Sequence, residues 1–340
     1  MLSAARARDG ALHAVLVRGE FSAPGLARSR RDPAAPVDDS GSVLSAVAPT
    51  GELIATLVSF ACHPTLLTAD NLEYSRDYPG VVRDTVEEFC GGTAIFLQGF
   101  AGDVNPVFQD HSARDMQLFG KQIGAAAASA ALSGLRYAQP AFTMNLSRDA
   151  VLPVRDGSPS VMLPVDRMSA TIAHVDVDAK PIVGPDASRR ALEVALAAEI
   201  SARSEGERER AVAVRQACWI DDLMASHSPV LGIDFPRGGH NTLPVQVFRV
   251  GPMLQIIALP GEPHISTARS LRARVGDTAL LVGYANAAPS YLPPAEAFAE
   301  HGYEVGSTRY ALGTVERLAD AAVRLAFAPT EATSDTIGGL

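Results

Sequence analysis

Short apolar runs alternate with amphipathic stretches along most of the chain. The apolar runs predict strands at 12–21, 52–62, 93–98, 140–152, 243–250, 253–259 and 278–284. Apolar residues spaced three or four apart predict helices at 79–90, 112–132, 187–203, 205–226, 263–274 and 313–327. Because strands and helices alternate, we expect an α/β fold, a layered domain with a mixed sheet flanked by helices.

Length and hydrophobic content favour one principal domain over residues 1–340. The sequence is 47% hydrophobic, which suffices for a full core in a chain of this size. The stretch at about 150–235 differs, because turn residues dominate much of it. We predict an irregular insertion there, of the kind that forms a lid or a partner surface.

The apolar run that ends at Cys62 is followed directly by His63 and Pro64. Proline removes a ladder donor and favours an extended conformation for the residue before it, so His63 is expected at a strand end. An imidazole in that place can bind a metal or transfer protons. The alternative is a side chain that only hydrogen-bonds a loop.

A second predicted strand, TAIFLQ, ends in the turn GFAGDVNP at 99–106. Gly99 and Gly102 allow the backbone to approach a ligand closely, and Asp103 supplies an acid. The turn has neither GxGxxG nor Gly-Lys-Ser/Thr, so it is not a phosphate loop. Ordinary turn chemistry also accounts for Asp103 and Asn105.

Five segments follow one another along the chain: SFACHP, SRDYPG, GFAGDVNP, ALPGEPHISTARSLR and GYANAAPSYLPPAEAFAEHGYEVGSTRY. Together they resemble the catalytic domain of neutral/alkaline non-lysosomal ceramidases, and more closely its bacterial relatives of unassigned substrate. The resemblance runs from about Leu26 to Leu325, except roughly residues 150–235. It implies a ceramidase-like catalytic α/β domain.

In that family two histidines, a glutamate and a tyrosine hold one zinc ion. The resemblance implies that three of the Zn2+ ligands are His63, Glu262 and Tyr291. Imidazole, carboxylate and phenolate are acceptable zinc donors, and a catalytic site leaves one position for water or substrate. Without the resemblance, Glu262 would be read as a charge at a helix N-terminus and Tyr291 as a packing aromatic.

The family's fourth ligand lies in an upstream His-Thr-His-Ser motif that this sequence lacks. The first residues resemble the helix and strand that follow that motif, so we expect a chain that begins after the first βα unit. Zinc would then be held by three protein ligands plus water, or the site would be incomplete. An uncovered strand edge would favour a homo-oligomer.

The second departure is Asn105, which stands where true ceramidases carry a serine nucleophile. An amide has no proton to lose at useful pH, so it cannot form an acyl-enzyme. Attack by water activated by the metal remains, with Asn105 donating an amide N–H to the oxyanion.

The resemblance gives weaker roles to further residues. Arg30 matches an arginine that lines the family's substrate cavity, although a solvated basic cluster also explains it. Tyr303 matches a second active-site tyrosine, expected to donate a hydrogen bond to a tetrahedral intermediate. Asp103 and Asp77 are acids near the same place, and either is a candidate to orient a ligand or act as a base.

Composition excludes several classes of function. A formal charge of −9 without a sustained basic block argues against nucleic acid as a partner. The 3 cysteines fit neither a disulfide framework nor a CxxC site. No apolar run approaches about 18 residues, so no transmembrane segment is predicted. No signal peptide pattern is visible, which leaves the cytoplasm as the default location.

These observations predict a zinc-dependent hydrolase of an amide or ester bond that works without a serine nucleophile. Its class would be the hydrolases of carbon-nitrogen bonds in linear amides, and its substrate a small or lipid-like amide. The alternative is a non-catalytic or truncated ceramidase-like protein that keeps the fold without a working metal site.

Overall fold

The computed structural model describes most of the chain in two compact units. The described residues are 13–32, 34–68, 70–138, 143–147, 150–153, 161–165, 167–180, 185–204, 207–208, 211–212, 214–216, 218–219, 240–287, 290–300 and 302–329. Unit 1 comprises Met1–Gly99, Val104–Arg167 and Gly251–Leu254. Unit 2 comprises Phe100–Asp103, Met168–Val250 and Gln255–Leu340. Each unit combines sheet and helix, which confirms the predicted α/β fold.

Unit 1 is built on a mixed five-stranded sheet in the order β5-β4-β3-β1-β9. Its strands are β1 (Val15–Ser22), β3 (Ser40–Val47), β4 (Leu53–Phe60), β5 (Thr93–Gln98) and β9 (Val161–Leu163). Only the β4–β5 pair is parallel, and the other pairs are antiparallel. The parallel pair is where the chain crosses over through a helix, as a parallel connection requires.

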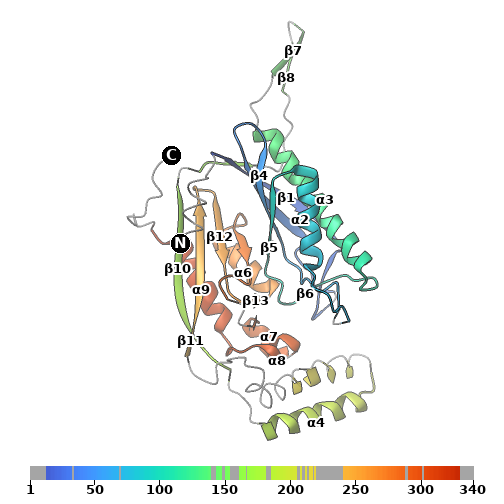
Figure 1. Ribbon diagram of the computed structural model, residues 1–340. Coiled ribbons are helices and arrows are strands. Elements are labelled where there is room, and N and C mark those ends of the chain that lie inside the picture. The colour runs from blue at the N-terminus through green and yellow to red at the C-terminus, as the bar shows by residue number, and fades with distance from the viewer. Residues whose placement is uncertain are drawn as a thin grey trace. The chain divides into compact units, whose positions relative to one another are not determined.

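Two helices, α2 (Asp77–Cys90) and α3 (Ala113–Ala138), lie side by side on one face of this sheet (Figure 1). They approach closely because α3 places glycines against α2. A Cβ on Gly120 would lie 2.5 Å from Val81 Cβ, and one on Gly124 would lie 2.6 Å from Thr85 Cβ. The absence of side chains at these two positions therefore sets the distance between the helices.

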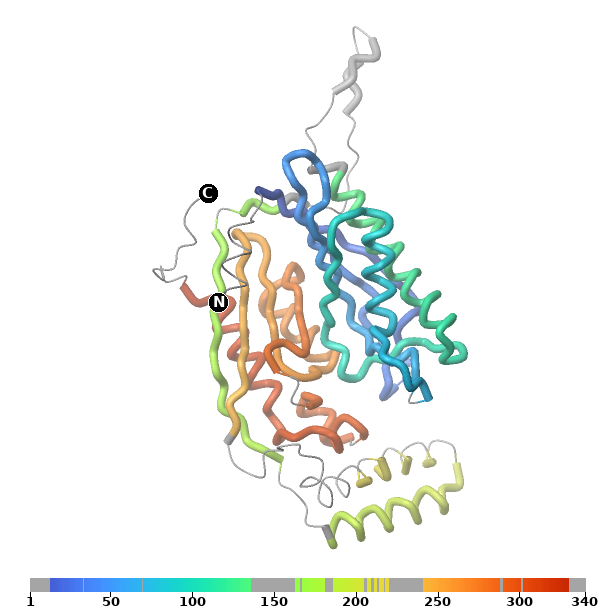
Figure 2. Tube along the Cα trace, viewed as in Figure 1, coloured from blue at the N-terminus to red at the C-terminus, as the bar shows by residue number. Residues whose placement is uncertain are grey.

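Unit 2 contains a four-stranded sheet in the order β10-β11-β12-β14. The strands are β10 (Met168–Asp178), β11 (His240–Val250), β12 (Leu254–Ala258) and β14 (Leu280–Val282). Helix α6 (Ile265–Val275) connects the parallel pair β12 and β14, and α9 (Thr314–Phe327) packs on β10, β11 and α6. In Figure 2 the tube runs from yellow-green at β10 through orange at β11 and β12 to red at α9.

Several short elements complete the description. They are β2 (Ala27–Ser29), β6 (Val104–Pro106), β7 (Thr143–Ser147), β8 (Ala150–Pro153), β13 (Glu262–Pro263), β15 (Tyr291–Leu292), α4 (Pro185–Ser201), α7 (Ala295–Glu300) and α8 (Tyr303–Ser307). In the part of the chain that is described, no helix is long and apolar enough to cross a membrane.

Most of the predicted elements are present, and the sequence explains one of the two main omissions. Strands β3 and β10 were not predicted, and β10 lies in the stretch expected to be irregular. Its side chains alternate between exposed and half-buried over most of its length, so its hydrophobic signal is weak. Pairing with β11 over eleven positions stabilises it instead. The predicted helix at 205–226 falls largely outside the described residues, and the single-domain organisation stays a prediction.

We predict that Gly120→Ala and Gly124→Ala each destabilise the fold. Overpacking at such a contact costs about 1–3 kcal/mol, which should outweigh the helix-propensity gain of about 1 kcal/mol. Chemical denaturation monitored by circular dichroism measures the change. Ser129→Ala, at an exposed position of α3, is the control and should not lower stability. Equal or higher stability of both glycine variants would contradict this account of the α2–α3 contact.

Candidate active site

His63 lies just beyond β4 and is held by the segments around it. The carbonyl oxygen of Cys62 accepts hydrogen bonds from Tyr78 Oη at 2.6 Å and from Gln98 Nε2 at 2.7 Å. The His63 N–H donates to the Val104 carbonyl oxygen at 3.0 Å. With 5% of its surface exposed, His63 is a buried residue at a strand end.

The ring of His63 has a defined tautomer. Its Nδ1 lies 3.1 Å from the same Val104 carbonyl oxygen. A carbonyl oxygen only accepts, so Nδ1 carries the proton and the lone pair of a neutral ring is on Nε2. Histidines that bind metals are commonly oriented in this way, with the other nitrogen donating to a backbone carbonyl.

Arg30 and Asn105 meet where β2 pairs with β6. The antiparallel register sets Arg28 opposite Asn105 and Ser29 opposite Val104. Just after β2, Arg30 directs Nε and Nη2 at Asn105 Oδ1, at 3.1 and 2.8 Å. Strand β6 therefore brings together the predicted residues His63, Asn105 and Arg30 within unit 1.

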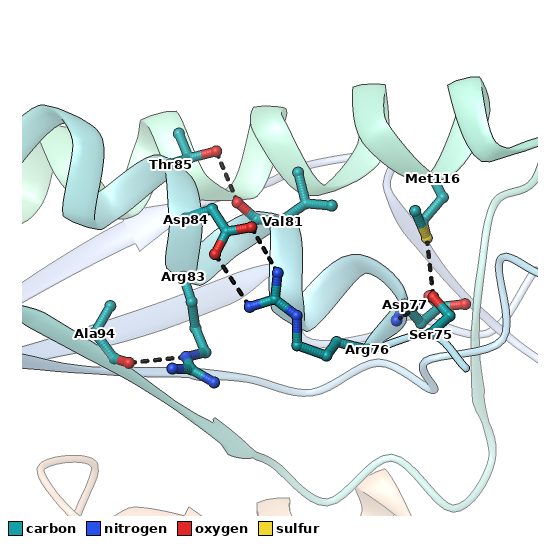
Figure 3. A network of polar contacts seen from close by, with 9 residues as sticks. All are labelled: Ser75, Arg76, Asp77, Val81, Arg83, Asp84, Thr85, Ala94 and Met116. Atoms are coloured by element: carbon teal, nitrogen blue, oxygen red, sulfur yellow. Dashed lines mark hydrogen bonds and ion pairs between the residues drawn. The ribbon is translucent and has the colours of Figure 1, made fainter. Parts of the chain in front are cut away.

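Asp77 uses its carboxylate to hold the segment that links His63 to α2. Oδ2 accepts the Leu67 N–H at 3.0 Å, and Oδ1 accepts the Tyr78 N–H at 2.7 Å. Its backbone is in the left-handed region, at φ 48°, and its N–H donates to Ser75 Oγ at 2.9 Å (Figure 3). These contacts give Asp77 a structural part at the start of α2, where a negative charge is favourable.

Cys62, next to His63, is a fully buried thiol. Burial, and then the negative charge of Asp77, raises the pKa of Cys62 well above its ordinary value of 9.0. The neutral thiol is a poor nucleophile and a poor metal ligand, since both roles need the thiolate. Cys62 is therefore a core residue beside the candidate site.

In unit 2, two predicted metal ligands are direct neighbours. Strands β13 and β15 pair in parallel with Glu262 opposite Tyr291. Residues opposite each other on adjacent strands project to the same face, about 5 Å apart. Both residues are half-buried. The Glu262 N–H donates to the Ser290 carbonyl oxygen at 3.1 Å, which continues the pairing.

Tyr303 joins this pair from the first position of α8. Its ring meets that of Tyr291 edge to face, with 5.7 Å between centroids. Two hydrogen bonds tie α8 to β15: Thr308 Oγ1 donates to the Tyr291 carbonyl oxygen at 2.8 Å, and Ser290 Oγ donates to the Ser307 carbonyl oxygen at 2.7 Å. Unit 2 thus brings Glu262, Tyr291 and Tyr303 together.

Asp103 caps helix α6 from a distant part of the sequence. Its Oδ1 accepts the Ile265 N–H at 2.8 Å, and its Oδ2 lies 3.8 Å from His264 Nδ1. Both Asp103 and His264 are buried. The carboxylate sits at the N-terminus of α6, which favours its charge and fixes the turn. The sequence analysis predicts no role for His264, although its position two residues after Glu262 indicates that it lies near the candidate site.

Gly102 allows the turn to lie directly on the segment that carries Glu262. Its N–H donates to the Pro263 carbonyl oxygen at 2.9 Å. A Cβ at this position would lie 2.4 Å from the carbonyl oxygen of Glu262 and 3.0 Å from His264 Cδ2. Glycine is therefore required here by close backbone approach.

The donor chemistry of the predicted ligand set suits zinc. The predicted set comprises an imidazole with its lone pair on Nε2 in unit 1, and a carboxylate beside a phenol in unit 2. Among the described residues, no group of three or more His, Cys, Asp and Glu side chains is placed to hold a metal ion. The predicted set would draw on both units and include a tyrosine, so its convergence stays a prediction.

Two ceramidases are among the solved structures that share the fold of this chain. Neutral ceramidase from Pseudomonas aeruginosa is 20% identical, with a TM-score of 0.62 over 93% of this chain and 52% of that chain. A ceramidase complexed with C2 is 18% identical, with a TM-score of 0.61 over 93% of this chain and 53% of that chain. The chain thus spans about half the length of these relatives. No protein-family model matches the sequence, and comparison with curated proteins finds no match. The ceramidase resemblance is confirmed for the fold.

We predict that Gly102→Ala destabilises unit 2 and displaces the turn. The methyl group meets a backbone oxygen that cannot swing aside, and overpacking of this kind costs about 1–3 kcal/mol. The thermal midpoint should fall. Gly276→Ala is the comparison variant: no atom lies within 4 Å of a Cβ at that position, so it introduces backbone strain without a steric clash. If Gly102→Ala proves as stable as the wild type, the turn is not held by this contact.

Cys62 is expected to resist thiol reagents in the folded protein and to react only after unfolding.

The raised pKa of Cys62 also makes the stability of the fold depend on pH. The neutral thiol is favoured in the fold, so this stability is fully present below the unfolded-state pKa and is lost as pH rises above about 9. Thermal midpoints across pH, compared with Cys62→Ala, measure the effect. If the thermal midpoint of Cys62→Ala declines above pH 9 as much as that of the wild type, the prediction is wrong. Cys218→Ala is the control.

Proposed function

We propose that this chain is the catalytic part of a zinc-dependent hydrolase that cleaves an amide or ester bond, with His63, Glu262 and Tyr291 as metal ligands. The observation that carries the proposal is the parallel pairing of β13 with β15, which sets Glu262 beside Tyr291. In this proposal the carboxylate and the phenol at these adjacent strand positions are two corners of a coordination site. The tautomer of His63 supports the third.

When bound, zinc would lower the pKa of a water molecule to about 7 and polarise the scissile carbonyl. Asn105 stands in place of a nucleophile and excludes an acyl-enzyme at that position. In our proposal Tyr303 and Asn105 donate hydrogen bonds to the oxygen that becomes negative in the transition state. Asp103, held at the N-terminus of α6, keeps the turn in place.

The proposed substrate is a lipid-like or small amide. The solved structures that share the fold are ceramidases, and this chain corresponds to about half of each. Glu262 and Tyr291 are half-buried and Tyr303 is 36% exposed, which is compatible with access by a bulky substrate. The competing hypothesis is a non-catalytic relative that keeps the fold. The two hypotheses differ in one property, since the non-catalytic relative has no functional metal site.

The test is metal content and hydrolysis in matched variants. We predict that His63→Ala and Glu262→Gln reduce zinc affinity by at least about tenfold, since loss of even a partner of a ligand typically costs about 10–100-fold. Hydrolysis of p-nitrophenyl acetate and of a short N-acyl p-nitroanilide should fall with it, and chelators should abolish both. Zinc is measured by elemental analysis after dialysis.

Two exposed residues provide the controls. His174→Ala on β10 and Glu296→Gln on α7 remove the same side-chain types from solvent-exposed positions. Both should retain zinc and activity. A protein that takes up no zinc, or whose zinc content is unchanged in His63→Ala and Glu262→Gln, would reject the proposed site and favour the non-catalytic alternative.

A further inference from the structure

The contact between Arg30 and Asn105 has a fixed polarity. A guanidinium group has donors only, so the amide atom that faces it must be the oxygen. Both contacts, from Nε at 3.1 Å and Nη2 at 2.8 Å, reach the same Asn105 Oδ1. In a flipped amide, N–H groups would point at N–H groups across the same distances. Arg30 therefore holds the amide in one of its two orientations.

The orientation determines what Asn105 presents on its other side. The oxygen and nitrogen of an amide point to opposite sides of Cγ, so Nδ2 and its two hydrogens are directed away from the guanidinium. An N–H2 group offers donors and no acceptor. The position thus suits an oxygen with lone pairs and does not suit a cation.

We infer that Arg30 is a positioning residue that keeps the Asn105 amide group aimed as a donor at a carbonyl or carboxylate oxygen of the ligand. The inference rests on the proposed function where it names the ligand as the acyl oxygen of a substrate. It differs from the sequence-based expectation, in which Arg30 itself lines the substrate cavity. Arg30 acts through Asn105.

Backbone contacts hold both partners in register, so the two side chains are brought together by the strands that carry them. Asn105 is the middle residue of β6 and pairs with Arg28 in β2. The chain after β2 is fixed because Ser29 Oγ accepts the N–H groups of Arg31 and Asp32, at 3.3 and 3.2 Å. Val104, the residue before Asn105, accepts both hydrogen bonds from His63. His63 is therefore bonded to the same strand that carries Asn105.

Two substitutions separate orientation from folding. Asn105→Asp keeps the shape and the contact with Arg30 but replaces the N–H2 group with an acceptor. Arg30→Met keeps much of the side-chain volume and frees the amide to turn over. Arg31→Met is the matched control, because it removes a neighbouring guanidinium and leaves the backbone N–H of residue 31 on Ser29 Oγ.

The first experiment measures p-nitrophenyl acetate hydrolysis by the full chain with zinc added. Asn105→Asp is expected to lower kcat by about 100-fold, the usual effect of removing one oxyanion donor, with an unchanged thermal midpoint. Arg30→Met should lower kcat by about tenfold or more and should cause no further loss in the Asn105→Asp background. Arg31→Met should match the wild type. Independent, multiplicative effects of the two substitutions would overturn the inference.

The second experiment needs neither zinc nor activity. Acetate is titrated into metal-free protein labelled with 15N only at asparagine, and the Asn105 side-chain N–H2 signals are identified by their loss in Asn105→Asp. The sequence contains few other asparagines, namely Asn71, Asn145, Asn241 and Asn286. Acetate should shift the Asn105 signals in the wild type and in Arg31→Met, and far less in Arg30→Met.

The two experiments separate failure of the inference from failure of the proposed function. Wild-type protein that hydrolyses nothing, but whose Asn105 signals respond to acetate only when Arg30 is present, retains the inference and loses the proposed reaction. Signals that acetate leaves unmoved, or moves equally in Arg30→Met, overturn the inference whatever the activity.

Discussion

The turn from Gly99 to Pro106 is the constraint on which the predicted site residues of each unit depend. In unit 2, the Gly102 N–H bonds the Pro263 carbonyl oxygen and Asp103 caps α6, which fixes the segment that carries Glu262. In unit 1, the Val104 carbonyl oxygen orients the backbone and ring of His63. Backbone contacts of this kind tolerate little change, because main-chain atoms cannot rotate away as a side chain does.

The partners of the polar side chains also determine their chemical roles. A carbonyl oxygen can only accept, so it assigns the proton of His63 to Nδ1. A guanidinium can only donate, so it assigns the oxygen of Asn105 to the side facing Arg30. Unit 1 therefore presents a lone pair from one residue and donors from the other. A metal and a carbonyl oxygen are the ligands that match these two properties.

The carboxylates divide into two groups by their contacts. Asp77 and Asp103 accept backbone N–H groups at the starts of α2 and α6, and so serve the positions of other residues. Glu262 lies half-buried beside Tyr291 on paired strands. A base or metal ligand needs an accessible oxygen, which favours Glu262 over the two aspartates for direct chemistry.

The sequence by itself determined the α/β class, most strands and helices, and the strand-end positions of His63 and the turn at 99–106, because apolar periodicity and proline or glycine act locally. The same local signals are weak in β10, whose residues are mostly exposed or half-buried, and in the two-residue strands β13 and β15. Only the tertiary structure decided that Glu262 pairs with Tyr291, that Asp103 caps α6 and that Arg30 holds Asn105. Each of these contacts joins residues far apart in the sequence through hydrogen bonds or strand pairing, and no local pattern specifies which distant partner a polar group will meet.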